Sequence, residues 1–243
     1  NPGLLHKYHS RVLLIVKGGC AVNCRYCFRR HFPYADNSLS NAELENNIAY
    51  IAADPAINEV ILSGGDPLMA KDSKLAALAE KIAALPHVKR LRIHPRLPVV
   101  MPSRLDASFY RWFAGLPVQR VLVLHINHAN EVSAELTEKL APLRQAGVTV
   151  LNQAVLLKGV NDTADTQAQL NEKVFAAGIM PYYLHLLDKV QGAAHFDIDV
   201  EQAREIMAGV IKRLPGFMVP KLVTEIGGQP GKTPVDLRLY PQD

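Results

Sequence analysis

The sequence has little cysteine, and the cysteine it has is crowded together. Only three of its 243 residues are cysteines, namely Cys20, Cys24 and Cys27. An odd and clustered set is a poor framework for disulfide bonds and is typical of a reducing compartment, so we expect a cytoplasmic protein. The cluster therefore needs a chemical explanation of another kind.

Long apolar runs and strong net charge are also absent. Apolar segments such as RVLLIV are only as long as strands, which excludes a membrane span by pattern. Glycine (15) and proline (16) are too few for a disordered or collagen-like chain. The net charge of +4 gives no case for nucleic acid. One dense basic group, Arg25, Arg29, Arg30 and His31, lies beside the cysteines.

Short apolar segments alternate with helical patterns along the chain. Segments rich in valine, isoleucine and leucine predict six strands, at 12–16, 59–62, 90–94, 120–125, 149–153 and 179–185. Helical patterns predict helices between and after them, at 41–53, 73–85, 107–115, 134–146, 165–177 and 199–214. This alternation predicts an α/β fold with a parallel sheet, either doubly wound or curled into a partial barrel.

No break in composition divides the chain, so we expect one domain over residues 1–243. Six βα units would occupy 11–214, between an N-terminal segment at 1–10 and a C-terminal segment at 215–243. Because the chain begins at Asn1 and not at methionine, we expect a further segment before it.

Polar or glycine-rich groups follow the predicted strands. KGGCAVNCRYCFRR follows the first strand, SGGD the second and HINHAN the fourth, and NQ and HLLD close the fifth and sixth. Because chemistry in parallel α/β folds lies at the carboxyl ends of the strands, this pattern predicts an active site at that rim.

The spacing Cys20-x3-Cys24-x2-Cys27 offers three thiolates from one loop. Three thiolates can hold three irons of a [4Fe–4S] cluster and leave the fourth iron open to a small molecule. Zinc is an alternative, with His31 as a fourth ligand in a nucleic-acid-binding module, and three unremarkable cysteines are another. Iron–sulfur is favoured because the chain has no other cysteine.

This motif, placed after the first strand of a six-fold βα pattern, resembles that of the radical S-adenosylmethionine (SAM) enzymes. The resemblance implies a partial (βα)6 TIM-like barrel, a [4Fe–4S] cluster whose open iron binds SAM, and an external one-electron reductant. Tyr26 matches the aromatic residue near the adenine. Ser63, Gly64, Gly65 and Asp66 match the family's motif that contacts the amino group of the methionine part of SAM. This sequence has aspartate where glutamate is usual. Gln153, on the rim, is placed with the SAM-binding residues.

A second informative stretch is GGQPGKTP, in which glycines surround Lys232. A phosphate-binding loop is excluded, because Ile226 stands where GxxxxGK[ST] needs glycine and Pro234 disfavours a following helix. A mobile surface turn and a Schiff-base lysine remain. Such a lysine condenses with an aldehyde, typically that of pyridoxal phosphate (PLP).

The glycine segment resembles the GG-x-x-GK-x-P motif of lysine 2,3-aminomutases, radical SAM isomerases that also use PLP. Further blocks match in order: HKYHSR, CRYCFRRHF, SGGDPL, HINHANE, GVTVLNQAVLLKGVND and MPYYLHLLD. The resemblance assigns Lys232 to the PLP lysine and Arg11, Lys7 and Tyr8 to the PLP phosphate region. It assigns Arg29 to the substrate α-carboxylate, and Asp188 and Glu225 to its distal ammonium. Glu225 replaces an aspartate of the lysine-degrading branch.

The resemblance implies conversion of L-α-lysine to (R)-β-lysine. Glu225 and the end of the chain at Asp243 favour the branch that modifies elongation factor P; a catabolic aminomutase is the alternative. We therefore expect an indirect link to elongation factor P and its ligase, no nucleic acid or membrane partner, and a homo-oligomer as one option. Asn127, His128 and Asn152 stay unassigned, and His125 and His185 are read equally well as core histidines and as site residues.

Overall fold

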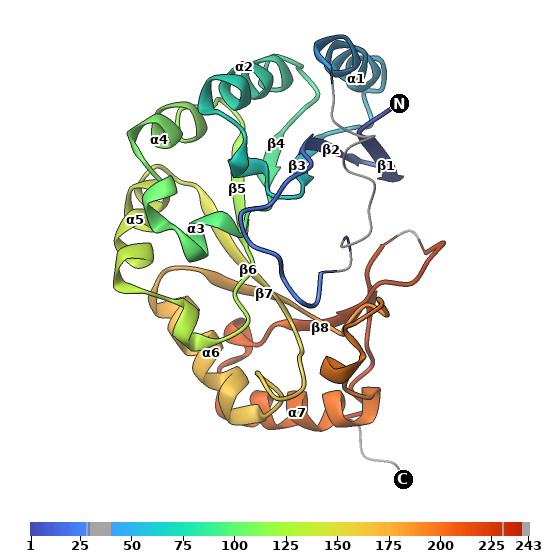
Figure 1. Cartoon of the computed structure of the whole chain (residues 1–243), viewed down its shortest axis with the longest axis vertical. Coiled ribbons are helices and arrows are strands. Elements are labelled where there is room, and N and C mark those ends of the chain that lie inside the picture. The colour runs from blue at the N-terminus through green and yellow to red at the C-terminus, as the bar shows by residue number, and fades with distance from the viewer. Residues whose placement is uncertain (28, 30–39, 230, 240–243) are drawn as a thin grey trace. The chain divides into compact units, whose positions relative to one another are not determined.

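The computed structural model describes residues 1–27, 29, 40–229 and 231–239, which form two compact units. Unit 1 draws on residues 1–23, 29–124 and 135–150, and unit 2 on 24–28, 125–134 and 151–243. Strands and helices alternate along both (Figure 1). Within the described part of the chain, no helix is long and apolar enough to cross a membrane.

Unit 1 contains five strands that lie side by side in chain order: β1 (Leu4–Tyr8), β2 (Arg11–Lys17), β3 (Glu59–Gly64), β4 (Arg90–Ile93) and β5 (Gln119–Leu124). β1 and β2 pair antiparallel, whereas β2 to β5 pair parallel. Parallel neighbours need crossover connections, and the helices of this unit supply them. They are α1 (Asn41–Ala53), α2 (Asp72–Ala83), α3 (Leu97–Val100), α4 (Ala107–Phe113) and α5 (Ala134–Gln145).

Unit 2 holds the end of β6 (Thr149–Val155), β7 (Met180–His185), β8 (Lys221–Thr224) and β9 (Thr233–Pro234). β6, β7 and β8 pair parallel, and β9 pairs antiparallel with β8. The helices α6 (Ala164–Ala176) and α7 (Val200–Arg213) contact each other, and the buried residues of α7 fall at helical spacing, for example Ala203, Met207 and Val210.

The six predicted strands are observed as β2 to β7, and the six predicted helices as α1, α2, α4, α5, α6 and α7. The prediction missed β1, β8 and β9. β9 is only two residues long, which is too short for a recognisable pattern, and the four residues of β8 lie beyond the last predicted helix. The two added pairings, β1 with β2 and β8 with β9, are antiparallel hairpins, which corrects the expectation of a purely parallel sheet. The single-domain expectation stays a prediction.

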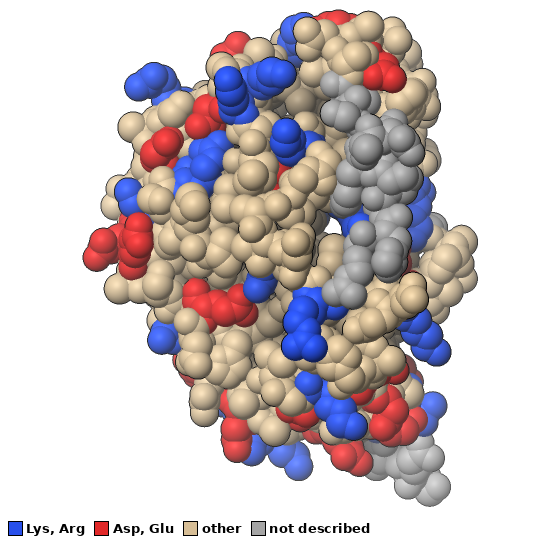
Figure 2. Space-filling model, in the orientation of Figure 1, with Lys and Arg blue, Asp and Glu red and all other residues tan. Residues whose placement is uncertain are grey.

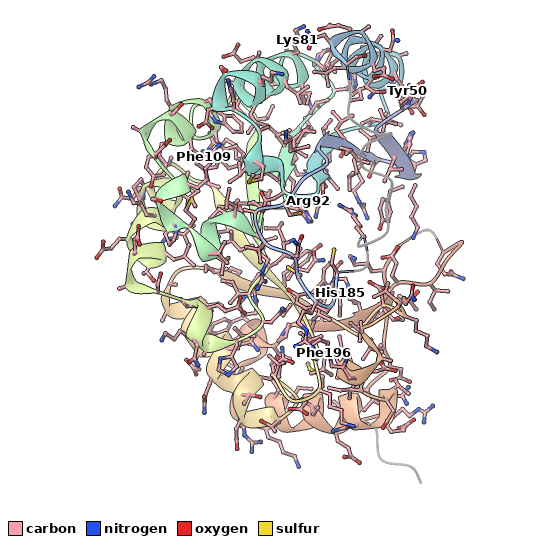
Figure 3. The ribbon with its side chains drawn as sticks, in the orientation of Figure 1. Tyr50, Lys81, Arg92, Phe109, His185 and Phe196 are labelled. Carbon is pink, nitrogen blue, oxygen red and sulfur yellow. The ribbon has the colours of Figure 1, made fainter. Side chains whose placement is uncertain are left out.

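The N-terminal strand β1 is attached to α1 by polar contacts. The His6 ring bonds the Tyr50 hydroxyl over 2.8 Å, and the two rings meet edge to face (Figure 3). Asn47, which is fully buried, donates to the Pro2 carbonyl over 2.9 Å. These bonds hold an edge strand whose outward side chains have little apolar surface to bury.

The turn after β3 packs backbone against backbone. The Gly65 amide donates to the Lys17 carbonyl (2.8 Å), and the Asp66 amide donates to the Gly19 carbonyl (3.0 Å). Gly64 has φ +127°, and a Cβ there would lie 2.3 Å from the Lys17 oxygen. Only glycine can occupy such a position without moving its neighbour, so the sequence SGGD is required by the fold itself.

We expect Gly64→Ala to lower the free energy of unfolding by about 2 kcal/mol or more, because it adds both a steric clash and a backbone strain. Gly19→Ala is the matched control, since a Cβ at Gly19 meets nothing within 4 Å and its φ is not positive. Urea unfolding followed by circular dichroism measures both variants. Equal midpoints for the two would contradict the close approach.

Candidate functional site

None of the three cysteines, all within the described part of the chain, forms a disulfide bond. Cys20, in unit 1, is exposed, while Cys24 and Cys27, in unit 2, are partly buried and share a turn in which the Cys27 amide donates to the Cys24 carbonyl (3.1 Å). Thiols that are not tied up in disulfides have the donor chemistry of iron–sulfur ligands. No group of three His, Cys, Asp or Glu side chains arranged for a metal ion occurs among the described residues. His31, the fourth ligand of the zinc alternative, lies outside them.

Arg25, part of the basic group beside the cysteines, is engaged within unit 2. Its guanidinium bonds the His195 ring over 3.1 Å and lies 5.1 Å from the centre of the Phe196 ring. This contact attaches the turn of Cys24 and Cys27 to the segment that follows β7. Arg25 therefore has a structural contact of its own, while Arg30 and His31 are not described.

Asp66, which ends the SGGD motif, is buried, with only 4% of its surface exposed. Its carboxylate accepts from three backbone amides, those of Leu68 (3.0 Å), Arg96 (2.7 Å) and Leu97 (2.7 Å). Burial raises its pKa, an effect that these hydrogen bonds and the charge of Arg104 oppose. The carboxylate thus braces the segment after β3 against the segment after β4. Its predicted contact with the methionine amino group stays a prediction.

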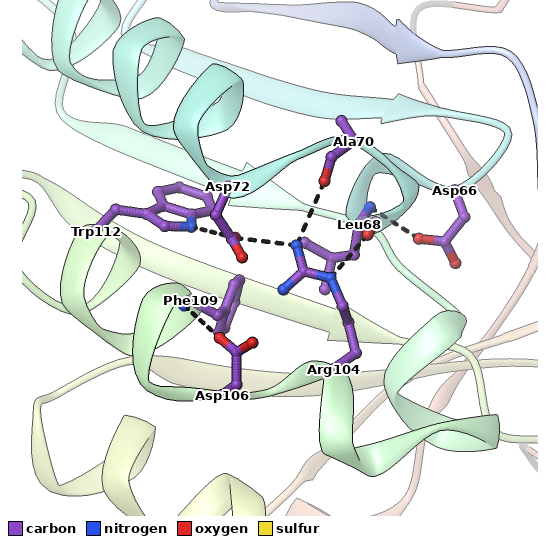
Figure 4. A network of polar contacts seen from close by, with 8 residues as sticks. All are labelled: Asp66, Leu68, Ala70, Asp72, Arg104, Asp106, Phe109 and Trp112. Atoms are coloured by element: carbon purple, nitrogen blue, oxygen red, sulfur yellow. Dashed lines mark hydrogen bonds and ion pairs between the residues drawn. The ribbon is translucent and has the colours of Figure 1, made fainter.

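A second set of contacts holds the short helix that follows Asp66 (Figure 4). Arg104 donates to the Leu68 carbonyl (2.8 Å) and to the Asp72 carboxylate (3.0 Å). The Trp112 indole donates to that same Asp72 oxygen over 2.7 Å. The end of β3 is therefore fixed from both sides, by the backbone beneath it and by the side chains of α2 and α4.

Arg29 lies against this motif. Its guanidinium donates to the Ser63 hydroxyl (3.0 Å) and to the Gly64 carbonyl (2.7 Å). The sequence assigned Arg29 to the substrate carboxylate and Ser63 and Gly64 to SAM. The structure brings these two predicted sets together, which spacing along the chain could not have indicated.

Lys7, Tyr8 and Arg11 form a cationic cluster across the β1–β2 hairpin. Tyr8 pairs with Arg11, whose guanidinium carbon lies 3.8 Å from the centre of the Tyr8 ring, and the Lys7 ammonium lies 5.7 Å from it. Two cations beside one aromatic ring and its hydroxyl suit a phosphate group. The hairpin, which the sequence analysis did not anticipate, is what brings these residues together.

Lys232 directly precedes β9, and Glu225 directly follows β8. Thr224 pairs with Thr233, so Glu225 and Lys232 flank the end of this pairing. The Lys232 ammonium lies 3.4 Å from the Glu225 carboxylate and 5.8 Å from the centre of the Tyr183 ring. The exposed fractions of the two side chains are 25% for Lys232 and 34% for Glu225, so both are partly buried.

Asp188 and His185 belong to the same cluster in unit 2. Burial raises the pKa of Asp188; Glu225 raises it further, and Lys232 lowers it. Burial, together with the charges of Lys232 and His125, lowers the pKa of His185 to about 3. The two carboxylates, the amine and the neutral imidazole therefore interact electrostatically. Sequence reasoning left His185 undecided; its place at the end of β7, as the first residue of HLLD, was the signal.

The unassigned asparagines serve the backbone. Asn152 accepts from the Ile126 amide (2.9 Å) and donates to the Ile126 carbonyl (3.0 Å), as a neighbouring strand would. Asn127 accepts from the Val155 amide over 2.9 Å, and the His128 ring accepts from the Asn130 amide over 3.2 Å. These residues shape the rim.

Tyr26 and Gln153 are partly buried, and their predicted SAM contacts stay predictions.

The visible surface carries both signs of charge. Lysine and arginine are interspersed with aspartate and glutamate over the residues drawn in colour (Figure 2). A nucleic-acid-binding face gathers basic side chains on one side. The face shown does not have that character.

Comparison with known proteins identifies the family. Residues 14–166 match the Radical SAM superfamily. The chain is 57% identical to the L-lysine 2,3-aminomutase of Escherichia coli K12 over 241 residues, which covers 99% of this chain and 70% of that protein. It is 52% identical to the L-lysine 2,3-aminomutase of Haemophilus influenzae, covering 96% of this chain and 69% of that protein.

A solved structure supports the fold. A radical SAM methyltransferase from Sphaerobacter thermophilus superposes with a TM-score of 0.63 at 17% identity, over 92% of this chain and 69% of that one. The expected α/β fold of the radical SAM type is thereby confirmed. The chain belongs to the lysine 2,3-aminomutase family of the radical SAM superfamily, isomerases that use a [4Fe–4S] cluster, SAM and PLP.

Proposed function

We propose that this chain converts L-α-lysine to (R)-β-lysine for the modification of elongation factor P. The observation that carries the proposal is the hairpin of β8 and β9, which holds the Lys232 amine beside Glu225, with Asp188 close enough to be affected by both charges. An amine for a cofactor aldehyde and two carboxylates for a substrate ammonium are the groups that this reaction needs.

The chain contains the residue types that each of the three cofactors needs. Cys20, Cys24 and Cys27 form no disulfide bond, and cysteine thiolates are the ligands of a [4Fe–4S] cluster. Gly64 and Gly65 lie so close to the backbone of residues 17–19 that side chains at these positions would clash with it, and the contact of the SGGD motif with SAM is part of this proposal. PLP needs cations for its phosphate and a lysine for its aldehyde, and Arg11 and Lys232 provide these groups in unit 1 and unit 2.

Lysine offers no easy polar route to a 1,2-amino shift, because the hydrogens on its Cβ are not acidic. When bound, the reduced cluster and SAM supply a carbon radical that can remove such a hydrogen, and PLP supplies the conjugated system through which the amino group migrates. The tasks left to the chain are to bind, to orient and to exclude water.

Different residues are assigned to the two ends of the substrate lysine. Arg29, whose guanidinium donors already meet polar oxygens at Ser63 and Gly64, is assigned the α-carboxylate. Asp188 and Glu225 are assigned the distal ammonium, since two mutually repelling carboxylates gain most from a cation placed between them. In the free protein, Lys232 partly fills that role through its contact with Glu225.

The link to elongation factor P rests on Glu225. The lysine-degrading branch that the sequence resembles has aspartate at this position, and glutamate extends the carboxylate by one methylene toward the amine it meets. We place the reaction in the cytoplasm, where thiols stay reduced. A catabolic aminomutase is the competing function.

We expect Lys232→Ala to lower aminomutase turnover by about a thousandfold or more, because the amine that condenses with PLP is gone. Reduction of the parent protein with borohydride should attach PLP covalently to the peptide that contains Lys232, and the variant should yield no such peptide by mass spectrometry. Cleavage of SAM by the reduced variant should stay measurable. Lys221→Ala removes an exposed lysine from the start of β8 and is the control. Equal turnover in the parent and Lys232→Ala would refute the assignment.

We expect Asp188→Asn to raise the KM for lysine by about tenfold or more, since it removes a charge-assisted hydrogen bond to the ammonium. The ionised form of Asp188 binds the cation, and its pKa lies above that of an ordinary aspartate. In the parent, affinity should therefore be lost as the pH falls through that raised pKa, and the loss should begin at a higher pH than for an exposed carboxylate. The variant should lose this dependence, whereas Glu205→Gln, on the exposed face of α7, should keep it. An unchanged KM profile in Asp188→Asn would count against the ammonium site.

We expect the whole protein that carries this chain to restore β-lysylated elongation factor P in a bacterium that lacks its own aminomutase gene. Intact-mass spectrometry of purified elongation factor P measures the modification, and Lys232→Ala provides the inactive control. Accumulation of free β-lysine with no change in the mass of elongation factor P would favour the catabolic alternative.

A further inference from the structure

His185 is buried at the end of β7 with an unused hydrogen-bonding atom. Its exposed fraction is 6%, and its Nε2 has no hydrogen-bond partner within the described chain. A buried polar atom without a partner is costly and rare in native proteins, and it calls for a specific explanation. Its position, labelled in Figure 3, is at the carboxyl end of a parallel strand, where ligands bind in this class of fold.

The strand β7 and the hairpin of β8 and β9 direct His185 and Lys232 toward the same ring. Tyr183 and His185 are two residues apart on β7, so their side chains lie on one face of the sheet, and their rings meet edge to face at 5.6 Å. The Lys232 ammonium lies 5.8 Å from the centre of that Tyr183 ring. His185 and Lys232 therefore flank one aromatic side chain.

The electrostatic environment keeps the His185 ring neutral. Burial and the charges of Lys232 and His125 lower its pKa to about 3, so at neutral pH one ring nitrogen carries a proton and the other does not. Asp188 and Glu225 are the acidic groups of the same cluster. Lys232 forms an ion pair with Glu225 and lowers the pKa of Asp188. A neutral ring can exchange a hydrogen bond with a ligand without adding charge beside the amine.

The chemistry of PLP indicates which atom would meet this ring. Its phosphate is assigned to the cations of Lys7 and Arg11, and its aldehyde carbon to Lys232. The 3-hydroxyl oxygen is attached to the ring carbon adjacent to the one that bears the aldehyde. It is therefore the polar atom of PLP that must lie nearest to the lysine nitrogen.

We propose that His185 is a cofactor-binding residue whose Nε2 forms a hydrogen bond with the 3-oxygen of PLP, beside the bond that PLP makes to Lys232. This inference rests on the proposed role of Lys232 and extends it. It gives the buried imidazole a function that the family resemblance, as matched residue by residue, had not supplied.

The experiment compares His185→Leu and His185→Gln in the reconstituted protein. His185→Leu removes the hydrogen bond and should weaken PLP binding by about tenfold, whereas His185→Gln, which places an amide near the Nε2 position, should restore part of the affinity. Absorbance titration with PLP measures the dissociation constant and the visible absorption maximum of the bound cofactor. Because the 3-oxygen is conjugated with the ring, His185→Leu should shift that maximum and His185→Gln should return it toward the parent value.

Thermal unfolding separates this role from simple packing. Without PLP, His185→Leu should melt at the parent temperature or above it, because it removes a buried polar atom that has no partner. With saturating PLP, its gain in melting temperature should be smaller than that of the parent. His87→Leu is the control: His87 Nε2 bonds the Ile51 carbonyl over 3.0 Å, so its loss should lower the melting temperature and leave PLP affinity unchanged.

Parent-like PLP affinity and absorption maximum in His185→Leu would overturn the inference. If His185→Leu does not fold, the same two measurements on His185→Gln and His185→Asn decide the matter, since Asn cannot reach the Nε2 position and should behave as the weaker binder. Failure of borohydride to attach PLP to Lys232 in the parent would refute the proposed function itself. Attachment in the parent, with all His185 variants unchanged, would refute this inference alone.

Discussion

Parallel pairing of successive strands is the constraint from which the functional residues of this chain take their positions. In unit 1, β2 to β5 run in the same direction, and in unit 2 β6 to β8 do so as well. Each unit therefore presents the carboxyl ends of its strands along one edge. The SGGD motif of β3 and the His185 end of β7 lie at such ends. Because the connections between parallel strands must cross back over the sheet, these ends are free to carry loops, and the loops carry the chemistry.

Antiparallel pairs of strands, β1 with β2 and β8 with β9, add further candidate site residues to those at the ends of the parallel strands. The β1–β2 hairpin brings Tyr8 against Arg11, and the β8–β9 hairpin brings Glu225 against Lys232. In the first hairpin Tyr8 and Arg11 are paired strand residues, and such residues have Cβ atoms only about 5 Å apart. In the second, Glu225 and Lys232 adjoin the paired strands, and their charged groups lie 3.4 Å apart.

Sequence reasoning recovered the parts of the fold that have a period and missed the parts that have none. The strands β2 to β7 are apolar runs flanked by helices with regular spacing, and each was predicted near its observed place. β9 is too short to show an apolar run, β8 lies beyond the last predicted helix, and β1 lies in the N-terminal segment at 1–10, for which no strand was predicted. The cysteine and lysine motifs could be predicted because a rare residue type or a glycine cluster marks them. The contact of Arg29 with Ser63 could not, since it joins residues that are far apart in the chain.

The buried polar groups of the site fall into two classes, and the distinction explains what each can do. Asp66, Asn127 and Asn152 spend their oxygen atoms on backbone amides, so their side chains hold the strand ends in place. His185 is buried as deeply but keeps a ring nitrogen without a partner among the described residues. A side chain that holds the backbone would have to give up its hydrogen bonds in order to bind a ligand, and this cost disfavours such binding. A group that is buried without its bond gains one when a ligand arrives, so part of the cost of folding is recovered on binding. Unit 2 thus combines satisfied polar groups, which hold the strand ends, with an unsatisfied ring nitrogen at the end of β7.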